Sequence, residues 1–205
     1  MNYNKLASQE ILDATVKALV EKGFEVFVVK NGAEALKKIK ELIPKGVSVM
    51  NGSSRTLEQI GYIDYLESGG HGWVNPKDAI LAEKDPAKQA FLRRQAVLSD
   101  YYLGSVHALA ENGEFVIGSN TGSQLPHVVF SSPNLIFVVS TKKIIPTLTG
   151  AMKRLEEHVV PLEDEHMRQL YKMGTKLNTV VIFKGESKFN GRTIRMILVK
   201  EDLGF

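Results

Sequence analysis

Hydrophobic and polar positions follow two alternating patterns along the chain. Some segments repeat apolar side chains every three or four residues, which is typical of amphipathic helices. These expected helices cover residues 9–22, 32–43, 56–68, 86–103, 144–160 and 164–173. Between them lie short runs rich in β-branched and aromatic residues, which are typical of strands. These expected strands cover residues 24–29, 46–50, 105–109, 114–118, 134–140, 179–185 and 192–202.

The order of these elements indicates an α/β fold. Residues 134–140 are apolar without alternation, as in a parallel strand that is covered on both faces. Asn-Gly pairs between apolar runs indicate hairpins at 105–117 and 179–199, and the glycines and proline of 69–78 indicate a loop. We therefore expect a mainly parallel sheet with helices on both faces and antiparallel edge hairpins. Neither a repeat nor a linker interrupts the pattern, so residues 1–205 are expected to form a single domain.

Composition narrows the classes of protein that fit. The chain is 43% hydrophobic and 24% charged, as folded proteins are, and its 26 basic and 23 acidic residues are interleaved. The small positive surplus gives no support for a nucleic-acid partner. No apolar stretch is long enough for a membrane span, and the first ten residues lack the apolar core of a secretory signal, so we expect a cytoplasmic protein. The absence of cysteine excludes disulfides, thiol catalysis and an iron–sulfur cluster held by this chain.

A small polar segment follows the strand expected at 46–50 and precedes a helix. It consists of Asn51, Gly52, Ser53, Ser54, Arg55 and Thr56. Its hydroxyls, the free N–H groups of a helix start and the guanidinium fork suit a phosphate or a carboxylate. A plain capped turn with Arg55 in solvent would explain the same residues. The spacing of a nucleotide-binding P-loop is absent.

A second polar segment has the same position between an expected strand and an expected short helix. It consists of Gly118, Ser119, Asn120, Thr121, Gly122, Ser123 and Gln124. A long capped turn would also explain it. Ligands of open α/β sheets bind at the carboxyl ends of the strands, where such segments gather. We therefore expect both segments, in one sheet, to share a cleft that binds a small anionic metabolite.

Acid–base candidates are Asp100, His107 and Lys143. Ser105 and His107 share one face of an expected strand, but no nucleophile elbow or orienting acid accompanies them. A structural, half-buried histidine is the simpler interpretation of His107. Trp73 could be a lid residue or a packing anchor, and the sequence leaves both open.

A group of histidines and carboxylates lies near the start of the last expected helix. It consists of His158, Glu163, Asp164, Glu165 and His166, whose spacing matches no compact metal motif. Carboxylates at this position favour a helix through its dipole, so we predict no metal and no cofactor held by this chain.

Three segments together resemble the lactate-utilization (LUD) domain family. They read SDYYLGSVHALAENGEFVIGSNTGSQLPHVVFSSPNLIFVVSTKKIIP, VMNGSSRTLEQIG and NGRTIRMILVKEDLGF. The resemblance covers nearly the whole chain and implies a fold like that of ribose-5-phosphate isomerase and the coenzyme A transferases. It implies a ligand over the ends of the parallel strands, and it adds Gly104 and Ser105 to the ligand-binding candidates. Where the sugar-phosphate isomerases of this fold carry an acid, the chain has Ser105-Val106-His107, so their chemistry does not transfer.

The sequence leaves three functions open. The leading hypothesis is a LUD-domain protein that binds a small carboxylated or phosphorylated metabolite in lactate-type organic-acid utilization. A second is a non-catalytic partner subunit of an iron–sulfur oxidoreductase, since some members of the family act with such partners. A third is an isomerase or coenzyme A transferase-like enzyme that uses Asp100 or His107. Whether the protein is an enzyme, and whether it forms a homo-oligomer, stays open.

Overall fold

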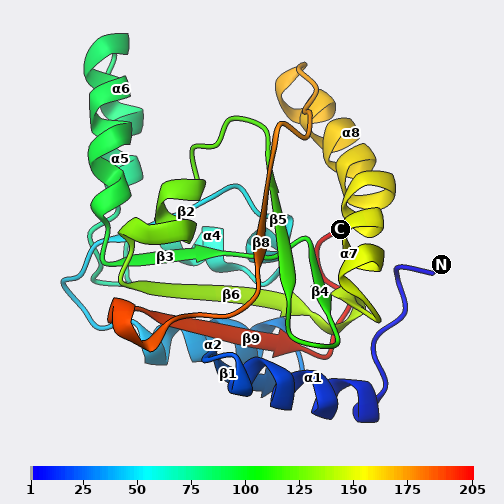
Figure 1. Ribbon diagram of the computed structural model, residues 1–205. Coiled ribbons are helices and arrows are strands. Elements are labelled where there is room, and N and C mark those ends of the chain that lie inside the picture. The colour runs from blue at the N-terminus through cyan, green and yellow to red at the C-terminus, as the bar shows by residue number, and fades with distance from the viewer. Residues whose placement is uncertain (1) are drawn as a thin grey trace.

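The computed structural model describes residues 2–205 and contains two sheets (Figure 1). The five-stranded sheet is parallel throughout, in the order β1 (Glu25–Val29), β9 (Thr193–Val199), β6 (Asn134–Ser140), β3 (Tyr101–Gly104) and β2 (Val49–Asn51). The four-stranded sheet has the order β7 (Ile144–Ile145), β4 (Ala108–Ala110), β5 (Phe115–Ser119) and β8 (Thr179–Phe183). In this second sheet, β5 is antiparallel to both β4 and β8, whereas β7 is parallel to β4. The expected α/β class is therefore confirmed.

Helices cover both faces of the parallel sheet. The first half of the chain contributes α1 (Gln9–Glu21), α2 (Gly32–Leu42), α3 (Arg55–Gln59), α4 (Tyr62–Glu67), α5 (Pro76–Ala82) and α6 (Pro86–Gln95). The second half contributes α7 (Leu148–Arg154), the π-helical turn η4 (Leu155–Val159) and α8 (Val160–Tyr171) as one continuous run. Short turns of helix are η1 (Ala96–Leu98), η2 (His127–Ser131), η3 (Thr141–Lys143) and η5 (Lys188–Asn190). None of the helices over residues 2–205 combines the length and apolarity needed to cross a membrane.

The central strand β6 explains why the core has two sides. Leu135, Phe137 and Val139 point into a cluster shared with α1 and the second sheet. Ile136 and Val138 alternate with them and point into a cluster shared with α2, α3 and α4. All five side chains are buried, so an unalternated apolar run is what this strand requires. A third cluster lies between the second sheet and the α7–η4 run.

Helices α5 and α6 extend away from the sheets (Figure 1). Helix α5 begins at Pro76, inside the segment that was predicted to be a loop. Asn75 is its N-cap: the Asn75 side chain accepts a hydrogen bond from the Lys77 N–H. Asp85 caps α6 in the expected way, yet no residue of α6 is buried. The prediction of a loop over 69–78 is therefore wrong from Pro76 onward.

Two further expectations are wrong in detail. Residues 101–103 were expected to end a helix but form strand β3, because their side chains fill both core clusters. The hairpin expected at 179–199 does not exist: β8 joins the second sheet, and β9 lies between β1 and β6. Gly191 does take the left-handed conformation of a tight turn, with φ +63°, but this turn connects two sheets.

Candidate functional site

A cavity of about 270 Å³ opens at the carboxyl ends of β2 and β3. Both polar segments of the sequence contribute to its wall. The site candidates from the sequence that line it are Gly52, Ser53, Ser54, Arg55, Thr56, Gly104, Ser105, His107, Gly118, Ser119, Asn120, Thr121, Ser123, Gln124 and Lys143. The second segment follows β5 of the antiparallel part, so the expectation that both loops belong to one sheet is wrong. The second sheet instead brings its loop to the edge of the parallel one.

Tyr102 ties the two polar segments together. Its hydroxyl donates a 3.2 Å hydrogen bond to Gln124 Oε1, and Gln124 Nε2 donates a 3.1 Å bond to the Gly118 carbonyl. A Cβ on Gly52 would lie 2.5 Å from the Tyr102 hydroxyl oxygen. Glycine at position 52 is therefore explained by the close approach of Tyr102.

Three candidates lie outside the cavity lining. Asp100 stands at the amino end of β3, where its carboxylate accepts hydrogen bonds from the Ser48 N–H at 2.8 Å and the Ser48 hydroxyl at 2.6 Å. These bonds lower the pKa of Asp100, so it is a structural carboxylate and not the acid–base group that was expected. Asn51 is buried and bonds the Gly52 carbonyl. Gly122 provides the turn of its segment at φ +74°.

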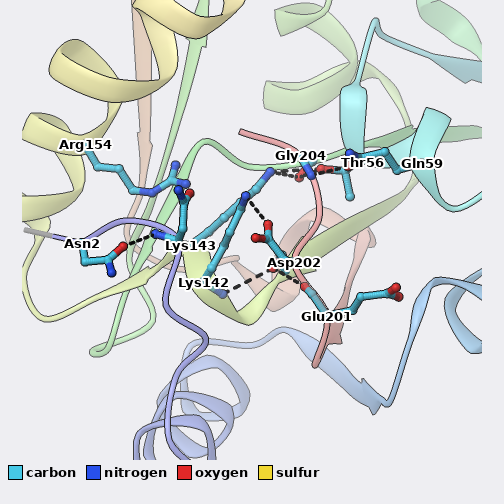
Figure 2. Close-up of polar contacts among 12 residues, drawn as sticks. Asn2, Thr56, Gln59, Lys142, Lys143, Arg154, Glu201, Asp202 and Gly204 are labelled. Carbon is cyan, nitrogen blue, oxygen red and sulfur yellow. Dashed lines mark hydrogen bonds and ion pairs between the residues drawn. The ribbon is translucent and has the colours of Figure 1, made fainter.

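Lys143 lies at the centre of the polar wall. It belongs to η3, directly after the carboxyl end of β6, and is 4% exposed. Its Nζ lies 3.1 Å from Thr56 Oγ1 (Figure 2). It also lies 3.0 Å from Ser105 Oγ and 3.3 Å from the Val106 carbonyl oxygen. All three neighbours are neutral oxygens, and no carboxylate within residues 2–205 forms an ion pair with it.

The electrostatic surroundings of Lys143 disfavour its charged form. Burial lowers its pKa well below the ordinary value for lysine, and the positive charges of Arg154 and Lys142 lower it further. Arg154 is itself fully buried and donates a hydrogen bond to the His107 carbonyl. Lys143 can therefore serve as a neutral amine, or as an ammonium once an anion enters the cavity.

His107 is held as a neutral imidazole. Its Nδ1 accepts a 3.1 Å hydrogen bond from the Gly118 N–H, which leaves the ring proton on Nε2. Burial, and then the charges of Lys143 and Arg154, lower the pKa of His107 to about 3. The His107 side chain is half-buried, as the simpler interpretation of the sequence expected, and it also lines the cavity. It can donate a hydrogen bond there but does not act as a base near neutral pH.

Arg55 lines the cavity but is already engaged. Its guanidinium forms an ion pair with Glu58 at 3.0 Å, one turn along α3. The side chain is 43% exposed, so its fork is shared between Glu58 and solvent. The expected anion clamp is therefore partly occupied.

The remaining wall comes from residues that the two polar segments did not reveal. They are Val106, Leu155, Val159, Val160, Glu163, Met167, Thr175, Lys176, Leu177 and Phe205. Burial is the main cause that raises the pKa of Glu163. Of this set, only Glu163 was noticed in the sequence, as part of the carboxylate group at a helix start. The apolar members are distant in sequence and carry no local signal.

The other two features of the sequence have structural roles. Trp73 is buried and packs against Tyr62 and Tyr65, so it is an anchor. His166 packs edge-on against Phe205, and His158 stacks near Tyr3. Among residues 2–205, no group of three or more metal-ligating side chains lies together.

The parallel sheet with helices on both faces makes this an α/β protein, and its cavity lies at the carboxyl ends of the strands, the edge at which open α/β sheets in general bind ligands. The family model for the LUD domain matches residues 12–195. The chain therefore belongs to the LUD domain family, which its motifs resemble.

A solved structure shares the fold. The crystal structure of a DUF162 family protein from Deinococcus radiodurans superimposes with a TM-score of 0.57 at 12% sequence identity. The similarity covers 95% of this chain and 99% of that chain. At this identity it shows the fold alone. None of the curated proteins compared with the chain matches its sequence.

Proposed function

We propose that the cavity binds a small metabolite bearing a carboxylate or a phosphate, in lactate-type organic-acid utilization. One observation carries the proposal: Lys143 is buried among neutral oxygens at a cavity whose wall is mostly hydroxyls, amides and glycines. A buried cationic group without a carboxylate partner is stabilised strongly by an incoming anion.

Other groups would orient the ligand. The Nε2–H of His107 supplies a neutral donor, and Lys176 adds a positive charge to the rim. Leu155 and Leu177 would contact the carbon skeleton; a Cβ on Gly118 would lie 2.7 Å from Leu177 Cδ1 and 3.0 Å from Leu155 Cδ1. Glycine at 118 therefore lets these leucines approach the polar loop and confines the ligand to a small molecule.

Binding is expected to take up a proton. An anion beside Lys143 favours the ammonium form and raises the lowered pKa of this amine. Titration calorimetry of lactate, pyruvate and ribose 5-phosphate in buffers of different ionisation enthalpy measures both affinity and proton uptake.

Variants separate the contributions of single residues. Lys143→Met is expected to weaken binding by about 10- to 100-fold, the loss of a charged hydrogen bond. Arg55→Ala is expected to weaken it less, because Glu58 already pairs with this guanidinium. Lys153→Met, an exposed lysine outside the cavity, is the matched control. Equal affinity of wild type and Lys143→Met, or no binding of any of the three anions to folded wild type, would contradict the proposal.

Exposed apolar side chains favour a second candidate function, that of a partner subunit. Leu98 on η1 and Phe130 on η2 are 74% and 77% exposed, and the Ser131 hydroxyl bonds the Val97 carbonyl between these turns. Such a paired apolar surface is typical of a protein interface. Without cysteine, the chain would rely on the partner for any iron–sulfur cluster. This role would be supported by co-purification with an iron–sulfur protein that is lost in the double variant Leu98→Ser, Phe130→Ser. Turnover by the isolated chain would contradict a purely non-catalytic role.

A further inference from the structure

Ser105, Lys143 and Thr56 form a cluster that binding alone does not require. Nζ of Lys143 lies within 3.1 Å of both hydroxyl oxygens, and the two hydroxyl oxygens lie 3.4 Å apart. Ser105 and Thr56 come from the ends of two neighbouring parallel strands, and Lys143 from the end of a third. All three line the same cavity. This is the arrangement of a nucleophile, a base and an orienting group.

The partner of Ser105 is the lysine and not the nearby histidine. His107 Nδ1 is occupied by the Gly118 N–H, so the pair that the sequence placed on one face does not interact as nucleophile and base. A neutral lysine amine has two N–H donors and one lone pair. The Val106 carbonyl can only accept, and Thr56 Oγ1 can accept the second N–H. As an ammonium, Lys143 donates to Ser105 Oγ at 3.0 Å, and the Ser105 hydroxyl donates to the Val106 carbonyl at 3.3 Å. In the neutral amine the lone pair is left for Ser105, whose hydroxyl can turn from Val106 and donate to Nζ over the same 3.0 Å.

We propose that Ser105 and Lys143 form a nucleophile–base dyad that cleaves a small acyl ester or thioester in this cavity. The proposal rests on the proposed function only in using the same cavity. It goes further in assigning a covalent reaction, and the acid released by that reaction is the kind of anion that the cavity is proposed to bind.

The reaction balances with water as the only co-reactant. Lys143 Nζ accepts the Ser105 hydroxyl proton as Oγ bonds to the acyl carbon and the carbonyl electrons move to oxygen. His107 Nε2–H is available to stabilise that oxygen. Collapse breaks the bond to the alcohol or thiol, which leaves with the proton from Lys143. Water then adds to the acyl carbon while Lys143 takes its proton. The bond from the acyl carbon to Ser105 Oγ breaks, Oγ takes the proton back from Lys143, and the acid is released.

The low proton affinity of Lys143 supports this role independently of the distances. An ammonium cannot accept a proton, and burial with Arg154 and Lys142 nearby lowers the pKa of Lys143. The apolar wall of Leu155, Val159 and Leu177 suits a short acyl chain.

A fluorophosphonate reagent tests the nucleophile directly. The full chain is incubated with it, and the adduct is located by intact mass and peptide mapping. We expect one adduct, on Ser105, which Ser105→Ala removes. Ser68→Ala, an exposed serine outside the cavity, should label at the wild-type rate. No adduct on folded wild type, or an adduct on another residue that Ser105→Ala leaves unchanged, would overturn the proposal.

Two lysine variants separate a base from a merely structural cation. Lys143→Met should label at least about 100-fold more slowly, the usual contribution of a positioned base. Lys143→Arg restores a cation but cannot accept a proton, so it should be equally slow; recovery of the rate in this variant would overturn the base role. Thermal unfolding of each variant shows that it is folded. If either lysine variant is unfolded, the pH profile of wild-type labelling decides, because a base requires the rate to rise with pH.

That profile has to be read against every ionisable group near Lys143. These are Lys142 on η3, Arg154 on α7, His107 before β4, Glu163 on α8, Arg55 on α3 and Lys176 before β8. A labelling rate that falls as pH rises, as for a group that has to be protonated, would overturn the dyad.

A second arm keeps the two proposals distinct. p-Nitrophenyl acetate carries no anionic group in its acyl part, so its turnover reports the dyad without anion binding. Lactate or pyruvate at saturating concentration should slow labelling, because a bound carboxylate occupies the cavity and favours the ammonium form of Lys143, which takes its proton from solvent. Labelling that no anion affects would support the dyad and contradict the anion site. Anion binding without labelling would support the anion site and contradict the dyad.

Discussion

Two adjacent lysines occupy opposite kinds of surroundings on the two sides of η3. Lys142 and Lys143 are 5% and 4% exposed. Lys142 forms an ion pair with Asp202, whereas Lys143 points to hydroxyls at the cavity (Figure 2). The same residue type therefore stabilises the fold on one side and offers reactive chemistry on the other. What differs is the partner, since a buried cation needs a counter-charge that only Lys142 has.

One short segment sets both surroundings. Residues 201–204 run along η3, with Asp202 beside Lys142 and Gly204 against Thr56 and Lys143. The Gly204 N–H donates a 2.6 Å hydrogen bond to Gln59 Oε1 on α3. This segment therefore places a carboxylate beside Lys142, which gains a counter-charge, and a glycine beside Lys143, which does not. Four experiments would break or sharpen this contrast.

Lowering the pH should produce the largest change in unfolding free energy, through His107 in the cavity wall. The pKa of His107 is about 3 in the folded protein against about 6.5 when unfolded, so the unfolded chain binds the extra proton between these values. This contribution is fully present above pH 6.5 and is lost as pH falls towards 3. Between pH 6 and 4 the unfolding free energy should fall by about 3 kcal/mol from this group. Urea unfolding of wild type and His107→Gln measures it.

His127 has to be separated from His107 in that experiment. Burial lowers its pKa to about 4, and it stacks on Tyr102. It remains in His107→Gln, so the difference between the two proteins isolates His107. Parallel pH curves for both proteins would contradict the assignment.

Gly204 is the next test, because it seals the Lys143 side. Its φ is +68°, and an added Cβ would lie 2.8 Å from Lys143 Nζ and closer still to Thr56 Oγ1. We expect Gly204→Ala to cost about 2–3 kcal/mol of unfolding free energy, from backbone strain plus overlap. Gly46 has φ +84° with no neighbour within 4 Å, so Gly46→Ala should cost only about 1 kcal/mol. Equal losses in urea unfolding would show that the segment does not press on Lys143.

The fold could be predicted from sequence wherever local signals and burial agree. The run 134–140 shows both its strand and its place between two helical layers. The single helix expected over 56–68 is divided into α3 and α4 at Gly61, which has φ +74°. Strand β3 fails this test, because Tyr-Tyr-Leu directly after a helix has no period of its own. The predicted hairpin of β8 and β9 is wrong because an Asn-Gly turn does not specify which sheet each of its flanking strands enters.

The candidate site was predictable only in part. The two polar loops carry a compositional signal, and both line the cavity. The contacts of Lys143 carry none, because Thr56, Ser105 and Lys143 are separated by dozens of residues and meet only once three strands are parallel. The same applies to Asp100, whose partner Ser48 lies 52 positions away.

Asp202 tests the structural side with a smaller effect. Asp202→Asn removes the partner of the buried Lys142, but Asp202 itself is 58% exposed, so solvent screens the pair. We expect a loss of about 1–2 kcal/mol, between exposed and buried ion pairs. Glu157→Gln breaks the pair with Lys153, in which both side chains are more than 60% exposed, and should change the unfolding free energy by less than about 0.5 kcal/mol. If both substitutions have the same effect, the burial of Lys142 adds nothing to its ion pair.

Lys143→Met is expected to have the smallest effect at pH 7. It removes hydrogen bonds to Thr56 and Ser105 but also removes the cost of burying an amine without a counter-charge, so the unfolding free energy should change by less than about 1 kcal/mol. The dependence of the unfolding free energy on pH distinguishes the two proteins better than its value at pH 7. The pKa of Lys143 is lowered in the folded protein. Between that lowered pKa and about pH 10.4, the unfolded chain therefore binds one proton more than the folded protein. Wild type should therefore lose stability relative to Lys143→Met as pH falls through this window, with the difference measured by urea unfolding from pH 7 to 10. A loss in Lys143→Met that exceeds that of Asp202→Asn and does not change with pH would mean that both lysines are paired cations, and the contrast between the two sides of η3 would not hold.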